Sequence, residues 1–279
     1  MNALPRPGPG PRFAGAGAVV TGASRGIGAA IARALAREGL QLLLVARDPD
    51  RLSSVTAEIT GAGGTASYLV QDLSAPDAAE NVVRAAREHL AAPYLLVNNA
   101  GIATAQRFDR RPREAWEAEL LTDLLAPLRL THAFLPTLLS QGRGHVIFVG
   151  SATADEPLPR LAVYSAAKSG LRGFGRALDL ELARRGVRVS VVEPVFVRTE
   201  LGRRPNDTEA PLERRAREHP RTVLEPDVVA RAVVRLLEHP RPVVRVPWAW
   251  AVGRLLLGAV NPVFEPRRRL PPPGARGSP

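Results

Sequence analysis

Short runs of apolar residues alternate along the chain with longer segments in which apolar residues recur at helical spacing. This alternation predicts buried strands at 16–20, 41–46, 66–70, 94–97, 146–149, 187–192 and 243–246. Helices are predicted between them, at 27–38, 51–60, 76–90, 113–139, 163–185 and 227–238. Buried strands that alternate with helices form parallel sheets covered on both faces. The pattern therefore predicts an α/β protein with a single doubly wound parallel sheet of about seven strands.

No internal repeat or change of composition divides residues 14–246, so we expect one domain there. Residues 1–13 are rich in Pro and Gly and lack the apolar stretch of a signal peptide, and we expect a flexible arm. Residues 198–225 are polar, rich in Arg and without periodicity, which is typical of a loop inserted over a substrate site. Residues 247–279 form an apolar segment followed by a basic Pro/Gly tail.

Composition excludes several kinds of chemistry. The chain has no Cys, which rules out disulfides and thiolate catalysis, and its 5 His residues lack the spacing of metal ligands. The formal net charge is +11, with most of the excess in the second half. The Arg residues are dispersed and accompany no known nucleic-acid-binding motif, so we expect no nucleic-acid partner. Only one Lys is present, Lys168.

A glycine-rich stretch lies between the first predicted strand and the first predicted helix. Glycines there let the backbone turn sharply and approach a phosphate at the helix N-terminus. The stretch contains the candidate cofactor-binding residues Gly22, Ser24, Arg25, Gly26, Ile27 and Gly28. After the second strand come Arg47 and Asp48. An acid at that strand end would favour NAD, whereas Arg would accommodate the 2′-phosphate of NADP. Asp48 lies one residue late, and Arg25 could grip the same phosphate, so NADP(H) is favoured over NAD(H).

At this point the sequence resembles the short-chain dehydrogenase/reductase family over about residues 14–246. The shared motifs are a TGxxxGxG loop, an acid after the third strand, an NNAG segment, a Ser followed by YxxxK, and part of a PGxxxT segment. The resemblance implies a Rossmann-type fold and an oxidoreductase that acts as a homodimer or homotetramer. It also implies cofactor contacts at Asp72, Leu73, Asn99, Ala100, Gly101, Tyr164, Lys168, Pro194, Val197 and Thr199.

Tyr164 and Lys168 are spaced to lie on one face of a helix. A free Tyr titrates near pH 10, and an adjacent ammonium together with a positive nicotinamide ring would favour its phenolate. We expect Tyr164 to donate a proton to a carbonyl oxygen as hydride arrives, while Ser151 holds that oxygen by a hydrogen bond. The resemblance further implies that Lys168 binds the nicotinamide ribose.

Two positions depart from the family pattern. Asp123 stands where the family has a fourth catalytic residue, an Asn, and it adds a negative charge that could pair with Lys168. Val195 replaces a Gly next to Pro194, with Glu193 before it, near the expected nicotinamide site. The proton relay, the cofactor pose and the turnover rate could all be altered by these changes.

The expected substrate site carries apolar residues above the strand ends, namely Ile102, Leu158, Leu161, Val195 and Phe196. They favour an apolar ketone, aldehyde or secondary alcohol as the small-molecule partner. Arg160 and Arg198 could bind an acidic group, but we favour solvated surface charges.

The apolar segment 248–264 admits three interpretations: a helix over the substrate pocket, an oligomer contact, or an interfacial membrane anchor. Trp248, Trp250 and the basic cluster at 267–269 suit an anionic lipid surface, but the segment is too short and too interrupted by Arg254 to span one. We therefore expect a cytoplasmic protein, with peripheral membrane association through 248–264 left open.

The sequence thus predicts an NADPH-dependent carbonyl reductase, reversibly an alcohol dehydrogenase, with Tyr164 as acid and base. The first alternative is a nucleotide-binding protein of the same fold whose catalysis is weakened by Asp123 and Val195. The second is a cofactor-free scaffold that binds acidic partners through its basic half.

Overall fold

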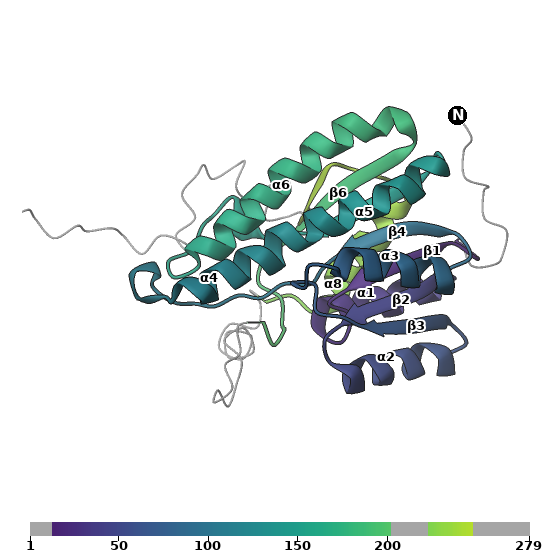
Figure 1. The fold of residues 1–279 in the computed structure, drawn as a ribbon, viewed down its shortest axis with the longest axis horizontal. Coiled ribbons are helices and arrows are strands. Elements are labelled where there is room, and N and C mark those ends of the chain that lie inside the picture. Colours follow the sequence, from purple (N-terminus) through teal and green to yellow (C-terminus); the bar gives the residue numbers. More distant parts are fainter. Residues whose placement is uncertain (1–12, 202–222, 248–279) are drawn as a thin grey trace, which may run out of the picture.

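A computed structural model describes residues 13–201 and 223–247 of the chain (Figure 1). The predictions for the N-terminal arm, for most of the 198–225 loop and for the apolar segment 248–264 fall on 1–12, 202–222 and 248–279. They lie outside the described residues.

The predicted sheet is confirmed. Its strands pair in the order β3-β2-β1-β4-β5-β6-β7, and every neighbouring pair is parallel. The order reverses between β1 and β4, which is where ligands bind in open α/β sheets. The strands are β1 (Gly17–Thr21), β2 (Gln41–Ala46), β3 (Thr65–Val70), β4 (Pro93–Asn98), β5 (Gly144–Val149), β6 (Val187–Pro194) and β7 (Val243–Val246).

Helices cover both faces of the sheet, as the alternating pattern predicts (Figure 1). One apolar core lies between the sheet and α1 (Gly26–Arg37), α2 (Pro49–Gly61) and α8 (Pro226–Glu238). The second core lies on the opposite face and is built on α3 (Ala78–His89), α5 (Ala126–Ser140) and α6 (Ala162–Leu182). Short helical turns η1 (Phe108–Arg110), η3 (Ala152–Ala154) and η4 (Ala183–Arg185) connect these elements.

The helix predicted over 113–139 is interrupted. It divides into α4 (Arg113–Leu120), a π-helical turn η2 (Leu121–Leu125) and α5. Pro127 lies at the start of α5, where it has no N–H to donate to the carbonyl of Asp123 and its ring clashes with that carbonyl in a regular helix. The helix therefore widens by one residue at this point. The widened turn carries Asp123, whose side chain is completely buried.

Candidate active site

A pocket of about 560 Å³ opens at the carboxyl ends of the strands. This volume lies within the usual range for sites that bind small molecules and cofactors. The site residues predicted from the sequence all line the pocket, with the exception of Gly28. The topology thus brings together in one cavity motifs that lie more than a hundred positions apart in the sequence, such as those of Gly22 and Thr199.

The glycine loop after β1 needs its glycines for different reasons. Gly22 has a φ of +64°, and a Cβ there would lie 2.8 Å from the Cα of Ala100. A Cβ on Gly28 would lie only 2.2 Å from the carbonyl oxygen of Gly22. Gly28 is therefore absent from the pocket wall because it packs α1 tightly against the loop. Gly26 has a φ of +54° and faces Thr199.

Asn99 holds this loop in place from the neighbouring strand. Its Nδ2 donates hydrogen bonds to the carbonyl oxygens of Thr21 (2.9 Å) and Gly22 (3.2 Å). The hydroxyl of Thr21 in turn accepts the backbone N–H groups of Asn99 (2.9 Å) and Ala100 (3.1 Å). The structure therefore gives the Asn99 side chain a positioning role at the β1/β4 reversal, beside any cofactor contact.

The N-terminus of α1 is free to bind an anion. Arg25 occupies the cap position, its side chain makes no capping hydrogen bond, and the first turn contains no acidic residue. The N–H groups and the positive end of the helix dipole therefore face the pocket, and no acidic residue of the helix's own first turn competes for them. This arrangement, together with the close-packed glycine loop, fits the pyrophosphate of a dinucleotide.

On the same side of the pocket, next to the carboxyl end of β2, the acidic residues are engaged by their own chain. The Oδ1 of Asp48 accepts the N–H of Arg51 (3.1 Å) and caps α2. The Oδ1 of Asp72 accepts the N–H (2.9 Å) and the hydroxyl (2.8 Å) of Ser74, and the backbone hydrogen bond lowers the pKa of Asp72. Arg47 lies 3.9 Å from the Asp72 carboxylate in an exposed ion pair.

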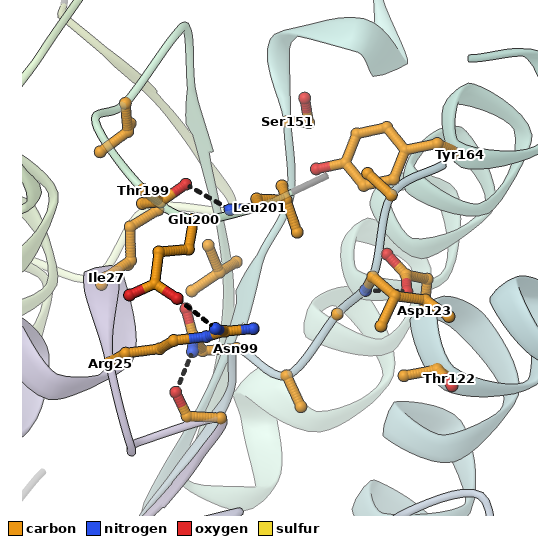
Figure 2. A pocket seen from close by; sticks show the side chains of 18 of the residues that line it. Arg25, Ile27, Asn99, Thr122, Asp123, Ser151, Tyr164, Thr199, Glu200 and Leu201 are labelled. Carbon is orange, nitrogen blue, oxygen red and sulfur yellow. Dashed lines mark hydrogen bonds and ion pairs between the residues drawn. The ribbon is translucent and has the colours of Figure 1, made fainter. Parts of the chain in front are cut away.

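Ser151 and Tyr164 present their hydroxyls to the same part of the pocket (Figure 2). Ser151 follows β5, and its Oγ accepts hydrogen bonds from the N–H (3.2 Å) and the hydroxyl (3.0 Å) of Thr153. Tyr164 and Lys168 lie one turn apart on α6, with the Lys168 ammonium 5.4 Å from the centre of the Tyr164 ring. The three predicted catalytic side chains are thus assembled.

Asp123 completes this group. Its Oδ2 lies 3.3 Å from the Nζ of Lys168, and its Oδ1 accepts the N–H of Ile102 at 2.8 Å. Lys168 also donates to the carbonyl oxygen of Val149 at 3.3 Å. The pairing of Asp123 with Lys168 that the sequence raised is therefore present. It is formed between two side chains that are almost fully buried.

The phenolate expected from the sequence depends on a nicotinamide ring beside Tyr164, and in the protein alone the pKa of Tyr164 is raised. Burial raises the pKa of Tyr164, the Lys168 ammonium opposes this, and the Asp123 carboxylate adds to it, with a raised pKa as the net result. Burial lowers the pKa of Lys168, but Asp123, Tyr164 and Glu119 together outweigh burial and the net shift is upward. Lys168 therefore stays protonated, and its ammonium acts both on the Asp123 carboxylate and on Tyr164.

Glu193 also differs from its sequence-based prediction. Its side chain is buried and does not line the pocket, because it pairs with Arg172 and, at 3.6 Å, with Arg245. Both Arg residues also pair with Asp155, which follows η3. The group ties the segment after Ser151 to α6, β6 and β7. Glu193 therefore supports the site from behind, whereas Val195 does line the pocket.

The apolar wall contains all the residues expected from the sequence. Ile102, Leu158, Leu161, Val195 and Phe196 line the pocket, joined by Ala103, Ala105 and Leu201. Arg160 and Arg198 do not line it, and Arg198 pairs with Glu225 at 3.0 Å. The structure thus places these two arginines outside the substrate region.

Several residues of the site were missed in the sequence. Arg51 and Glu200 line the pocket at its adenosine end. Arg51 is in the first turn of the helix that follows Arg47, so its proximity was a usable signal. Glu200 stands in a segment without periodicity, and no sequence pattern points to it. Behind Asp123, Glu119 and Arg111 form a buried ion pair at 2.5 Å.

The part of the chain that the structure describes holds no group of three or more His, Asp or Glu side chains placed to bind a metal. In these same residues, no helix has both the length and the apolar composition needed to cross a membrane.

Comparison with known proteins agrees with the fold and the motifs. The family model described as short chain dehydrogenase matches residues 16–210. The chain belongs to the short-chain dehydrogenase family. It is 35% identical to a 3-oxoacyl-acyl-carrier-protein reductase of Escherichia coli over 195 residues, 70% of this chain and 79% of the relative. It is 32% identical to an uncharacterised oxidoreductase of Staphylococcus saprophyticus over 224 residues, 80% of this chain and 91% of the relative.

Solved structures of the same fold include two with NADP or a derivative. An alcohol dehydrogenase of Thermococcus sibiricus, complexed with 5-hydroxy-NADP, is 30% identical with a TM-score of 0.72, covering 82% of this chain and 95% of its own. A protein of Beutenbergia cavernae assigned as a gluconate 5-dehydrogenase, with NADP at low occupancy, is 31% identical with a TM-score of 0.75. The match covers 86% of this chain and 98% of that protein.

Proposed function

We propose that the protein is an NADP(H)-dependent oxidoreductase that transfers hydride between the nicotinamide and the carbonyl or secondary alcohol of an apolar substrate. One observation carries the proposal: a single pocket joins a glycine loop and an uncapped helix N-terminus at one end to Ser151, Tyr164 and Lys168 at the other.

The basic residues around the second strand support NADP over NAD. Arg25, Arg47 and Arg51 all line the adenosine end of the pocket. Asp48, the acid that would favour the ribose hydroxyls of NAD, is used as the cap of α2. Guanidinium groups form paired, charge-assisted hydrogen bonds with phosphate. The NADP found in similar structures agrees with this preference.

The chemistry of the reduction follows from the side chains around the apolar wall. NADPH, when bound, supplies the hydride. Ser151 holds the substrate oxygen by a hydrogen bond, and Tyr164 donates its proton to that oxygen as negative charge develops. Tyr164 carries the proton to be donated, because its raised pKa keeps the phenol protonated at neutral pH, and the positive charges of Lys168 and of an oxidised nicotinamide would stabilise the phenolate that remains. Lys168 stays charged beside the Tyr164 ring, and its ammonium lowers the free-energy cost of forming the phenolate.

The apolar wall supports the choice of substrate class. Ile102, Leu158, Leu161, Val195 and Phe196 surround the space beyond Ser151 and Tyr164, and Arg160 and Arg198 lie outside it. An acidic substrate would find no partner for its charge among the described residues of this wall. We therefore propose an apolar ketone, aldehyde or secondary alcohol.

A second candidate is a nucleotide-binding protein of the same fold with weak catalysis. The Asp123 carboxylate at 3.3 Å from Lys168 favours it, because its negative charge opposes the positive charge that would stabilise the Tyr164 phenolate. The intact Ser151–Tyr164–Lys168 arrangement favours the enzyme.

Parallel titrations with NADPH and NADH, followed by nicotinamide fluorescence, test the cofactor. We expect NADPH to bind at least about tenfold more tightly, which corresponds to one additional charge-assisted contact. A screen of apolar ketones and alcohols for NADPH oxidation or NADP reduction then separates the two candidates. Cofactor binding with no turnover on any substrate would favour the weakly catalytic protein, and binding of neither nucleotide would contradict both.

A further inference from the structure

The carboxylate of Glu200 lies between the guanidinium groups of Arg25 and Arg51, at the end of the pocket expected to hold the adenosine. Figure 2 shows Glu200 beside Arg25. Its Oε2 lies 2.5 Å from Nη1 of Arg25, and its Oε1 lies 3.1 Å from Nη1 of Arg51. Arg25 lies at the N-cap position of α1, Arg51 lies in the first turn of α2, and Glu200 follows β6. Three segments far apart in the sequence thus meet at one carboxylate.

The backbone before Glu200 is fixed against the glycine loop. A Cβ on Gly26 would lie 3.2 Å from the methyl carbon of Thr199, so the Thr199 side chain packs directly over that glycine. The hydroxyl of Thr199 accepts the N–H of Leu201 at 3.3 Å, which holds the short turn 199–201. This turn carries the Glu200 side chain across the cofactor groove, from the β6 side to the α2 side.

The two arginines offer the donors that a phosphate monoester would take. A carboxylate bridging two guanidiniums and a phosphate bridging them use the same N–H groups and the same charge complementarity. Burial raises the pKa of Glu200, but its hydrogen bond with Arg51 and the charge of Arg25 outweigh this and hold the pKa below its usual range. Glu200 is therefore ionised at neutral pH, and it occupies the arginines as an anion would.

Arg25 and Arg51 belong to the basic group that the proposed function assigns to the 2′-phosphate of the cofactor. We infer that Glu200 occupies these two arginines as an internal anion, which the phosphate must displace. The inference rests on the NADP(H) dependence proposed above. It assigns to Arg51 a direct phosphate contact, and it makes Glu200 a residue that weakens NADP(H) binding and so narrows the preference for NADP(H) over NAD(H).

A different role for Glu200 has the opposite consequence. An acid at the adenosine end of the groove could accept the ribose hydroxyls of NAD. In that case Glu200 would strengthen the binding of nucleotides that lack the 2′-phosphate, and removing its charge would weaken them. The two roles therefore predict changes of opposite sign.

The test uses the full-length protein and two probes that differ only in the 2′-phosphate, 2′,5′-ADP and 5′-AMP, with dissociation constants from calorimetry at fixed ionic strength. The variants are Glu200→Gln, Arg51→Gln and the double variant. Glu225→Gln is the matched control, because Glu225 pairs with Arg198 at 3.0 Å in the same region, does not line the pocket, and changes the net charge equally. Thermal unfolding verifies that each variant is folded.

We expect Glu200→Gln to bind 2′,5′-ADP about threefold to tenfold more tightly, the size of one or two partly exposed ion pairs. Binding of 5′-AMP should change by less than about twofold, and Glu225→Gln should change neither probe by more than that. Arg51→Gln should weaken the binding of 2′,5′-ADP about tenfold and have little effect on the binding of 5′-AMP. In the double variant, the gain in 2′,5′-ADP affinity from Glu200→Gln should be smaller, because Arg51, one of the two partners of Glu200, is already replaced.

Unchanged or weaker binding of 2′,5′-ADP by Glu200→Gln would overturn the inference. So would a loss of 5′-AMP and NADH affinity in that variant, which would make Glu200 a ribose acceptor. Both results are compatible with NADPH binding by the unsubstituted protein. Failure of the unsubstituted protein to bind NADPH at all would instead overturn the proposed cofactor, and the inference with it.

Discussion

The Lys168 ammonium lies 3.3 Å from Oδ2 of Asp123, and neither side chain is exposed by more than 5%. The charge of the only lysine in the chain is thus compensated within the protein, directly beneath Tyr164. Taking one member out of a buried ion pair is costly, so the two residues stabilise the site as a unit. The same pair acts on the pKa of Tyr164, which burial raises: Lys168 lowers this pKa and Asp123 adds to the rise.

Replacing Asp123 with Asn should shift the pH dependence of catalysis. Asn keeps an acceptor for the N–H of Ile102 but removes the negative charge, so the pKa of Tyr164 should fall. For alcohol oxidation, which needs the phenolate, the rising limb of the pH–rate profile should move to lower pH, and kcat at neutral pH should be equal or higher.

The measurement is kcat against pH for the oxidation direction, with unfolding temperatures alongside, since the uncompensated Lys168 is expected to cost stability. A loss of kcat of more than about tenfold in a folded Asp123→Asn protein would show instead that the carboxylate itself takes part in the reaction.

A Cβ at Gly28 should destroy the cofactor site. Gly28→Ala would place a carbon 2.2 Å from the carbonyl oxygen of Gly22, and relief requires α1 to move away from the loop. We expect loss of NADPH binding together with a lower unfolding temperature. The matched control is Gly173→Ala on α6, where a Cβ meets nothing within 4 Å and the better helix former should stabilise by about 0.5–1 kcal/mol. Normal NADPH affinity in Gly28→Ala would contradict the packing described here.

His145 should make the protein sensitive to mild acid. Burial lowers its pKa from 6.5 to about 3, and its Nε2 is 2.9 Å from the hydroxyl of Ser190. Below pH 6.5 the unfolded chain takes up a proton that the folded protein refuses, so stability falls as the pH drops from about 6.5 toward 3. The loss from this one group approaches about 1.4 kcal/mol per pH unit.

Urea unfolding between pH 7 and pH 5 measures this effect. The unsubstituted protein should lose more stability over that range than His145→Gln, and His89→Gln, at an exposed position of α3, should behave like the unsubstituted protein. Equal pH slopes for the unsubstituted protein and His145→Gln would show that His145 is not the group responsible.

Most of the fold could be predicted from the sequence because each strand is a compact apolar run and each helix shows clear periodicity. The catalytic group could be predicted because Tyr164 and Lys168 are one helical turn apart and Ser151 follows a strand. The π-helical turn at Leu121–Leu125 was not predictable from periodicity, since the same apolar pattern suits a continuous helix and only Pro127 hints at the break.

Contacts between side chains that are distant in the sequence could not be predicted either. Glu193 was placed near the nicotinamide because it precedes Pro194, but strand neighbours point to opposite faces and its side chain meets Arg172 instead. Glu200 reaches Arg25 across 175 positions, and nothing local marks that meeting. The raised pKa of Tyr164 follows from burial, which a list of neighbouring charges does not contain.

The most direct test of the proposed function is Tyr164→Phe, with Tyr68→Phe on the edge strand β3 as the control. NADPH affinity and the rate of NADPH oxidation with a reducible apolar ketone are measured for both. We expect Tyr164→Phe to bind NADPH as the unsubstituted protein does and to lose at least about a hundredfold in kcat, the usual contribution of a general acid. Tyr68→Phe should keep both the NADPH affinity and the kcat of the unsubstituted protein. Undiminished turnover in Tyr164→Phe would contradict the assignment of Tyr164 as the proton donor.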